Sequence, residues 1–350
     1  MMLRSMFLAL ALFAAPALAS PEESAAELGA ILDRAEGLAP LETVVIAHRG
    51  AIVAERGYRG HATTAPANIM SASKSVMSAL VGIAIDKGVL EGPEQPIAPL
   101  LAGDLPRNPD PRLGRITIGH LLSMQAGLGS TSGANYGAWV NSANWVRSAL
   151  ARPFEDEPGG RMIYSTGSSH LLSAILTRRT GRSTLALARD WLGPLEGFSV
   201  ASWGRDPQGN YLGGNLMAMS PRSLLAFGEL YRRSGMTPDG RRLIAADWIA
   251  ASWEARTASR YTGDGYGYGW FSRRIAGEDV KYSWGYGGQM LYVVPRLELT
   301  VVMTSNAHAP SSRTGHRDDL HALLGEIIGA VSGAESGNTN QEAGSGDRKD

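Results

Sequence analysis

The segments with β-strand character lie at the two ends of the chain, whereas the residues between them have mostly helical patterns. Near the N-terminus, β-branched residues at 43–47 and an apolar run at 51–54 flank a short turn with Gly. Near the C-terminus, 290–294 and 299–303 flank a turn that begins at Pro295. Runs of this length around turn residues indicate β-hairpins. Two terminal hairpins around a helical centre predict an α/β (α+β) fold, with one antiparallel sheet formed by both chain ends and flanked by helices.

The residues between these hairpins show the three-to-four-residue spacing of apolar side chains that indicates amphipathic helices. Loops rich in Pro and Gly separate the helical segments. The predicted helices, including one outside each hairpin, are 27–37, 71–87, 118–125, 143–151, 168–180, 183–192, 221–234 and 320–328. Because no repeat and no linker interrupts the pattern, we predict one domain over 20–331 with a helical subdomain inserted at roughly 90–220.

The two termini differ in composition from the rest of the chain. Arg4 is the only charge before residue 22, and an apolar run and the small-residue pattern Ala17-Leu-Ala19 follow it. This order predicts a signal peptide over 1–19, and hence a periplasmic or secreted protein. The run is shorter than the about 20 residues that a spanning helix needs, so no stable membrane anchor is expected, and a retained anchor is the alternative. At the other end, 332–350 is polar and rich in Gly and Ser, which predicts a disordered tail.

Composition excludes several classes of function. The 33 basic and 33 acidic side chains give a net charge of zero, which argues against a nucleic-acid partner. The chain has no Cys, which excludes disulfides, thiolate-bound metals and a Cys nucleophile. Its seven His are scattered, so we predict no metal and no cofactor. Any catalysis must therefore rely on oxygen and nitrogen groups.

The motif that carries chemistry is Ser71-Ala-Ser-Lys74 at a predicted helix start. Residues three apart lie on one helix face, so Lys74 can reach the Ser71 hydroxyl. A Ser needs a base to become a nucleophile, and Lys serves as one only when its pKa is lowered. The chain favours this role because it has 29 Arg but only four Lys, and Arg cannot give up its proton. The competing interpretation, a helix cap beside a solvated charge, stays equally open on spacing alone.

Around this motif the sequence resembles the serine β-lactamase and penicillin-binding-protein superfamily, and most closely its class C β-lactamase-like serine hydrolases. The nucleophile segment of that family is similar to residues 68–76, and its Tyr-x-Asn motif to Tyr164-Ser-Thr166. Its edge strand, with Lys-Thr-Gly or His-x-Gly, is similar to Trp284–Gln289. Three further segments agree in order, at 116–128, 209–214 and 225–231. The resemblance implies the serine β-lactamase/DD-peptidase-like fold.

The resemblance also implies a role for each matching residue. Ser71 would be the acylated nucleophile, Lys74 its general base and Tyr164 the second member of the proton relay. The backbone N–H groups of Ser71 and Gln289 would form the oxyanion hole. The residues implied in substrate binding are Thr166, Trp284, Tyr286, Gly287 and Gly288.

Two positions depart from the family pattern. Thr166 stands where β-lactamases have the Asn that holds the substrate amide, and Tyr286 stands where they have the Lys that helps bind a substrate carboxylate. The acyl-transfer groups are thus present without the usual carboxylate-binding residue. We therefore expect hydrolysis of a small-molecule ester or small amide rather than strong β-lactamase activity.

Two other functions stay open. A D-Ala-D-Ala carboxypeptidase or weak β-lactamase would use the same nucleophile, and a non-catalytic module would bind cell-wall fragments or β-lactams without turnover. The oligomeric state and the natural substrate do not follow from the sequence. The aromatic side chains either line an acyl pocket or belong to the hydrophobic core: Tyr136, Trp139, Trp145, Tyr266, Tyr268, Trp270, Trp284 and Tyr286.

Overall fold

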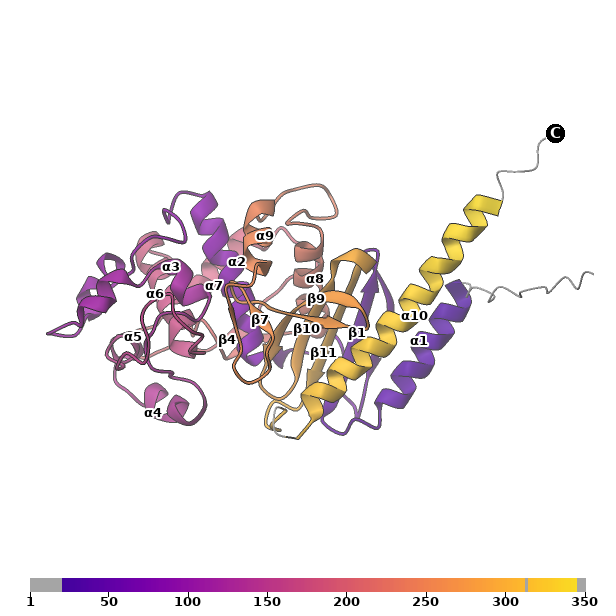
Figure 1. The fold of residues 1–350 in the computed structure, drawn as a ribbon, viewed down its shortest axis with the longest axis horizontal. Helices are drawn as coiled ribbons and strands as arrows, with labels where there is room; N and C mark the ends of the chain where they lie inside the picture. The colour runs from indigo at the N-terminus through magenta and orange to yellow at the C-terminus, as the bar shows by residue number, and fades with distance from the viewer. Residues whose placement is uncertain (1–20, 312–313, 345–350) are drawn as a thin grey trace, which may run out of the picture.

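The computed structural model of the chain describes residues 21–311 and 314–344. Within them, a large antiparallel sheet lies beside a helical subdomain, and two long helices lie on the far side of the sheet (Figure 1). This arrangement confirms the predicted fold class. The predicted signal peptide, 1–19, lies outside the described residues.

The large sheet includes both predicted hairpins. Its strands in chain order are Leu41–His48 (β1), Ala51–Gly57 (β2), Thr257–Ala258 (β6), Gly265–Tyr266 (β7), Phe271–Ile275 (β8), Glu278–Gly285 (β9), Gln289–Val294 (β10) and Leu299–Ser305 (β11). Their spatial order is β2-β1-β11-β10-β9-β8-β7-β6. β1 pairs with β11 from Leu41 and Ser305 to His48 and Leu299, so the two chain ends complete one sheet as predicted.

A second, three-stranded sheet was not predicted. It consists of Ala67–Asn68 (β3), Ser202–Trp203 (β4) and Met217–Met219 (β5), in the order β3-β5-β4. These strands are only two or three residues long, too short to leave a periodic pattern in the sequence. Because β3 ends just before the Ser71 segment, this sheet ties that segment to β5.

Most predicted helices are present within a few residues of their predicted bounds. The helix predicted over 118–125 ends at Leu122, and 136–140 and 246–253 form helices that were not predicted. The α-helices are Pro21–Ala35 (α1), Ser73–Asp86 (α2), Ile118–Leu122 (α3), Tyr136–Val140 (α4), Trp145–Leu150 (α5), Thr166–Thr180 (α6), Thr184–Trp191 (α7), Pro221–Arg232 (α8), Ala246–Trp253 (α9) and His316–Gly344 (α10). The 3₁₀ segments are Met70–Ala72 (η1), Pro99–Asp104 (η2), Pro111–Arg115 (η3), Gly133–Asn135 (η4) and Pro295–Leu297 (η5).

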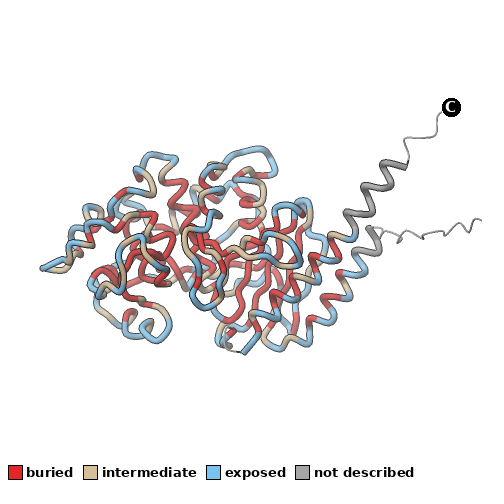
Figure 2. Tube along the Cα trace, in the orientation of Figure 1, coloured by how far each residue is buried: buried red, intermediate tan, exposed pale blue. Residues whose placement is uncertain are grey.

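Helices cover both faces of the large sheet. α1 and α10 lie side by side on one face (Figure 1), where they bury Val44 and Val301. α2 and α8 pack on the other face, which buries the alternate residues Val45 and Val302. Successive strand residues point to opposite faces, so the central strands are apolar on both sides and form the buried centre of the molecule (Figure 2).

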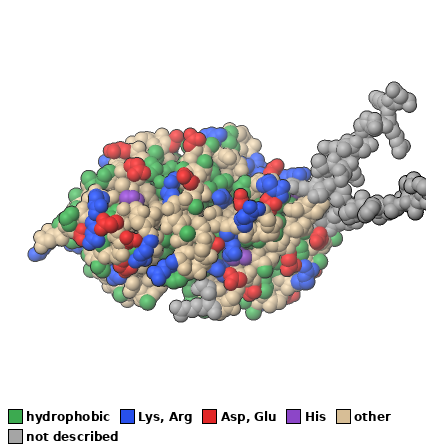
Figure 3. Space-filling model, in the orientation of Figure 1, with side chains coloured by type: hydrophobic (Ala, Val, Ile, Leu, Met, Phe, Trp, Pro, Cys, Tyr) green, Lys and Arg blue, Asp and Glu red, His purple; other side chains and the backbone are tan. Residues whose placement is uncertain are grey.

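The C-terminal helix is longer than predicted. It begins at His316 and continues to Gly344, into the segment that composition assigns to a disordered tail. Across 21–311 and 314–344, no helix combines the length and apolar character needed to cross a membrane. On the face shown in Figure 3, basic and acidic side chains are interspersed.

One close contact in the core gives a test of this packing. The Trp248 indole lies over Gly82 in α2 and donates a hydrogen bond to Ser78 O (3.1 Å). A Cβ at residue 82 would lie 2.3 Å from the indole ring, so Gly82→Ala should lower the free energy of unfolding by about 1–3 kcal/mol through overpacking. Urea unfolding followed by Trp fluorescence measures this loss.

Gly29 in α1 is the matched control, because a Cβ there would meet nothing within 4 Å. Gly29→Ala should instead stabilise the protein by about 0.5–1 kcal/mol through helix propensity. Equal effects of the two substitutions would contradict the close approach at Gly82.

Candidate active site

Ser71 lies in η1, the tight turn between β3 and α2. The turn is anchored from Ile69, whose N–H donates to Met217 O (2.9 Å). The next residue, Met70, has φ +50°, a left-handed conformation that costs a non-Gly residue about 1–2 kcal/mol. Its N–H bonds Asn68 Oδ1 (2.9 Å), which helps to hold this conformation. A strained residue immediately before a half-exposed Ser is typical of a functional turn.

Lys74 lies one helical turn after Ser71 and is buried, with 3% of its surface exposed. Its Nζ donates to Ser71 Oγ (2.9 Å) and to Gly214 O (2.8 Å). Burial lowers the pKa of Lys74 from its ordinary value to about 7. A substantial fraction of the amine is therefore neutral near pH 7 and can accept the Ser71 proton.

Tyr164 lies two residues before α6 and contacts both Ser71 and Lys74. Its ring lies over Lys74, with 4.9 Å from Nζ to the ring centroid. Burial raises the pKa of Tyr164 to about 12, and a side-chain hydrogen bond with Ser71 opposes this rise. The phenol rests against Tyr266 and Phe271, at centroid distances of 6.2 and 6.4 Å. The structure thus brings Ser71, Lys74 and Tyr164 together.

Three consecutive hydroxyl residues, Ser130 to Ser132, hold Tyr164 in place, and sequence reasoning missed them. Ser130 Oγ donates to Tyr164 O (2.6 Å), and Ser132 Oγ accepts from the N–H of Thr166 (2.8 Å). Thr131 Oγ1 accepts from Gly167 N (2.7 Å). A distant segment therefore caps the first N–H groups of α6, which would otherwise lack partners. Thr166 faces Ser132, with Oγ atoms 2.9 Å apart, so its hydroxyl belongs to this cap.

Sequence reasoning also did not single out Gly214. A Cβ at this position would lie 2.9 Å from Lys74 Nζ, so only glycine lets the loop backbone approach the amine. The signal was present in the sequence as the pair Gly213-Gly214, inside a segment that resembles the family.

The end of β9 forms the other wall of the site. The pairing of β8 with β9 ends at Tyr282, so Ser283 to Gly285 extend beyond β8 and face η1. Ser283 Oγ donates to Ala72 O (3.2 Å), and a Cβ at Gly285 would lie 2.3 Å from Ile69 O. The expectation of an edge strand is thus corrected: β9 is an interior strand, and only its last residues have an open edge.

The residues after Gly285 do not all face Ser71. Gly287 and Gly288 have φ of +85° and +103° and lie against the loop at Asn306 and against α10. Gln289 is fully buried at the start of β10, and its side-chain amide donates to Ser305 O on β11. Tyr286, in contrast, is 51% exposed.

Trp284 is half-buried on β9, and the Arg317 guanidinium lies 5.2 Å from the centre of its ring. Arg317 also pairs with Asp318 (3.0 Å). The positive charge beside Trp284 is therefore partly neutralised. Most of the other aromatic residues of the sequence belong to the hydrophobic core rather than to a pocket wall: Trp139, Trp145, Tyr266 and Trp270. Tyr268 is also buried, but it lines a separate cleft.

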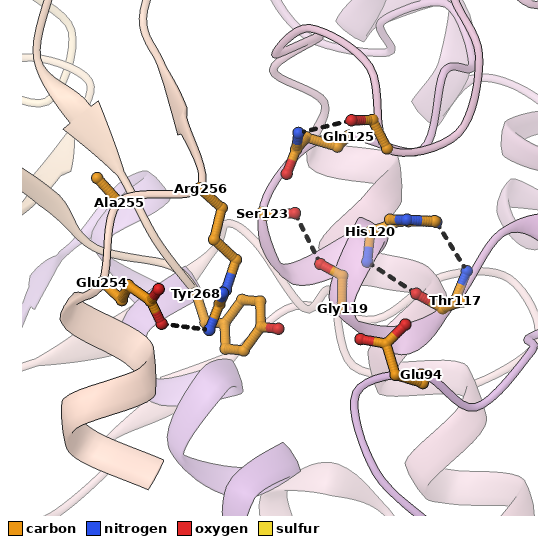
Figure 4. Close-up of a pocket in the computed structure, with 11 residues that line it drawn as sticks. Glu94, Thr117, Gly119, His120, Ser123, Gln125, Glu254, Ala255, Arg256 and Tyr268 are labelled. Atoms are coloured by element: carbon orange, nitrogen blue, oxygen red, sulfur yellow. Dashed lines mark hydrogen bonds and ion pairs between the residues drawn. The ribbon is translucent and has the colours of Figure 1, made fainter. Parts of the chain in front are cut away.

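A separate cleft of about 360 Å³ lies between α3 and the segment after α9 (Figure 4). Its polar groups are largely paired with one another. Arg256 pairs with Glu254 (3.3 Å) and lies over the Tyr268 ring, and His120 accepts from Thr117 N (3.2 Å). The cleft contains none of the three reactive groups above, so it is distinct from the candidate site. Among the described residues, no cluster of three or more His, Asp or Glu could hold a metal.

Comparison with known proteins agrees with the fold. A family model described as beta-lactamase matches residues 31–326. Solved structures with a similar fold include EstCE1, a hydrolase with promiscuous acyltransferase activity (17% identity, TM-score 0.69, covering 89% of this chain and 99% of that one). A penicillin-binding protein homologue from Caulobacter crescentus (16%, 0.69, 88% and 98%) and a beta-lactamase from Mycobacterium bovis (17%, 0.64, 86% and 99%) are also similar. At these identities the likeness concerns the fold alone.

The lowered pKa of Lys74 gives a prediction for stability. The folded state holds Lys74 with a pKa of about 7, whereas the unfolded chain has an ordinary value near 10.4. Between these pH values the unfolded chain binds more protons, so the cost of burying Lys74 is relieved as the pH rises. Between pH 7 and 9, the wild type should gain up to about 1.4 kcal/mol per pH unit relative to Lys74→Met. Urea unfolding of both proteins measures this difference, and parallel pH curves would contradict it.

Proposed function

Since the chain belongs to the beta-lactamase family, we propose that it is a serine hydrolase that forms an acyl-enzyme on Ser71 and hydrolyses esters or small amides. The observation that carries this proposal is the 2.9 Å hydrogen bond between Lys74 Nζ and Ser71 Oγ. A buried amine with a pKa of about 7, in contact with a half-exposed hydroxyl, is a nucleophile paired with its base.

In the acylation step, Lys74 Nζ takes the proton of Ser71 while Oγ bonds to the substrate carbonyl carbon. Collapse of the tetrahedral intermediate breaks the bond to the leaving group and forms the acyl-enzyme. Tyr164 has a pKa of about 12, so its phenol is protonated near neutral pH and can give that proton to the leaving oxygen or nitrogen. The proton held by Lys74 then restores the phenol, because the two groups face each other. In the second half-reaction a water molecule gives a proton to Lys74 Nζ and bonds to the acyl carbon. The bond between that carbon and Ser71 Oγ then breaks, Oγ takes the proton from Lys74, and the acid is released.

The negative oxygen of the intermediate needs two N–H donors. Ser71 N–H is one of them. We assign the second to Tyr286 rather than to Gln289, because Tyr286 directly follows Gly285, the residue in contact with Ile69 and close to Met70. Gln289 is committed to the sheet by its burial and by its bond to Ser305.

The substrate side of the site supports an uncharged ester or small amide. With Tyr286 as the donor, the triplet before it is Ser283-Trp284-Gly285, which contains no Lys to bind a carboxylate, and the exposed Tyr286 side chain is also uncharged. Arg317, the cation beside Trp284, is paired with Asp318. A D-Ala-D-Ala carboxypeptidase or a strong β-lactamase would need an unpaired cation at this place to bind its substrate carboxylate.

We also propose that residues 1–19 are a signal peptide and that the enzyme acts on small molecules in the periplasm or outside the cell. Expressed in a Gram-negative host, the protein should be recovered from the periplasm with Ser20 as its first residue. Intact-mass spectrometry tests this cleavage. A protein that keeps Met1 or stays with the membrane would contradict it.

The assignment of Ser71 is tested with p-nitrophenyl acetate and p-nitrophenyl butyrate. The wild type should turn over both esters, and Ser71→Ala should lower kcat/KM at least about 1,000-fold because no other nucleophile is available. Lys74→Arg keeps the charge but cannot act as a base, so it should lose about 100-fold or more.

Nitrocefin serves as the control substrate. Turnover of nitrocefin exceeding that of the esters would favour the β-lactamase alternative. If the wild type and Ser71→Ala are equally inert while both are folded by circular dichroism, the chain is a non-catalytic binding module and the proposal fails.

A further inference from the structure

A buried histidine–aspartate pair, His170 and Asp206, lies in the helical subdomain and takes no part in the proposed reaction. Both side chains are completely buried, and His170 Nε2 lies 2.9 Å from Asp206 Oδ2. The imidazole is packed against Trp139 and Trp145, each 5.6 Å away between ring centroids, and among the described residues its Nδ1 has no hydrogen-bond partner. Such a pair is costly to bury, so its position calls for an explanation.

Asp206 organises the start of the loop that ends at Gly214. Its Oδ1 accepts from the N–H groups of Gln208 (2.9 Å) and Asn210 (2.8 Å), which closes a turn. Its Oδ2 accepts from Asn210 Nδ2 (2.8 Å) and from His170, which belongs to α6. Burial alone would raise the pKa of Asp206, but the hydrogen bonds from His170 and Asn210 lower it on balance. The carboxylate is therefore ionised, and His170 Nε2–H donates to it.

The rest of this loop is seated on the same face of α6. Ser173 Oγ donates to Tyr211 O (2.6 Å), and Gly213 passes so close to α6 that a Cβ there would lie 2.1 Å from Ser169 O. The next residue, Gly214, accepts from Lys74 Nζ. An uninterrupted series of contacts thus runs from His170 along the loop to the amine.

We propose that the His170–Asp206 pair is a positioning device that keeps the 206–214 loop seated on α6, and thereby keeps Gly214 O on Lys74 and water away from the amine. This inference rests on the proposed function only in giving Lys74 its role as base. The physical link is the burial of Lys74, because burial is what lowers its pKa. If the loop leaves α6, water reaches Nζ, and the pKa of Lys74 returns toward its ordinary value near 10.4.

Asp206→Asn separates the two tasks of this side chain. The remaining carbonyl oxygen can still accept from Gln208 N and Asn210 N, so the turn itself is kept. The new amide group, however, faces Nε2–H of His170, so this bond can form only after the imidazole moves its proton to Nδ1, which has no partner among the described residues. The substitution therefore weakens the link to α6. His170→Gln is the conservative partner, since its amide can still donate to Asp206.

The state of Lys74 can be measured directly, without any substrate. The chain contains only four lysines, Lys74, Lys87, Lys281 and Lys349, so protein labelled with ¹³C at lysine Cε gives four NMR signals. Lys74→Arg identifies the signal of Lys74. In the wild type this signal should titrate near pH 7. In Asp206→Asn it should titrate at clearly higher pH, and His170→Gln should lie between the two.

The control is a second buried histidine that lies on the other side of the sheet. His321 Nδ1 bonds the Tyr292 hydroxyl (3.0 Å), and both residues are buried. His321→Asn should lower the melting temperature as Asp206→Asn does, but leave the Lys74 titration unchanged. Gly213→Ala provides a second way to lift the loop, and it should move the titration of Lys74 in the same direction as Asp206→Asn.

Ester hydrolysis gives the functional counterpart. The rising limb of kcat/KM against pH should move to higher pH in Asp206→Asn, with a loss of about 10-fold or more at pH 7. A Lys74 signal that stays in place in both Asp206→Asn and Gly213→Ala would overturn the positioning role. If the signal moves but no variant, the wild type included, hydrolyses an ester, the positioning role stands and the proposed function fails.

Discussion

The burial of Lys74 is the constraint on which the rest of the site depends. A lysine amine in water is almost entirely protonated near neutral pH, because its pKa lies near 10.4. A protonated amine cannot accept the proton of a hydroxyl. A neighbouring carboxylate would keep it charged even when buried. Among the described residues, the groups that bond or face Nζ are neutral: the Ser71 hydroxyl, the Gly214 carbonyl and the Tyr164 ring. The protein must therefore exclude water from the Lys74 amine while leaving the Ser71 hydroxyl accessible.

The fold meets this requirement by bringing together three segments that are far apart in the chain. The large sheet, made by the two chain ends, supplies a rigid edge at Ser283 to Gly285. The inserted subdomain supplies α6, which begins beside Tyr164 and, one to two turns later, contacts the 206–214 loop through His170 and Ser173. One helix thus adjoins both Tyr164 and the loop that contacts Lys74. The nucleophile itself is held between the two parts by the pairing of β3 with β5.

The sequence alone predicted the parts of this arrangement that local patterns encode. Hairpins, helices and the Ser71–Lys74 pair follow from periodicity, spacing and the scarcity of Lys. Tyr164 came only from family resemblance, because no spacing rule connects it to Lys74 across 90 residues of chain. The Ser130–Ser132 cap depends on hydrogen bonds between distant segments, which leave no local pattern. The proposed second oxyanion donor depends on the residue at which β9 ends, and such boundaries are the least predictable feature of a strand.

The exposed position of Tyr286 has a consequence for how such an enzyme can diversify. Lys74 bonds the Gly214 carbonyl, and Tyr164 is held by the Ser130 hydroxyl. A substitution on the substrate side of the site leaves both contacts unchanged. Tyr286 stands beside two glycines with positive φ and leaves about half of its surface exposed. Substitution of the Tyr286 side chain should therefore cost little stability, since surface positions tolerate substitution far better than cores. The side chain at this position can therefore vary without disturbing the contacts that hold Lys74 and Tyr164 in place.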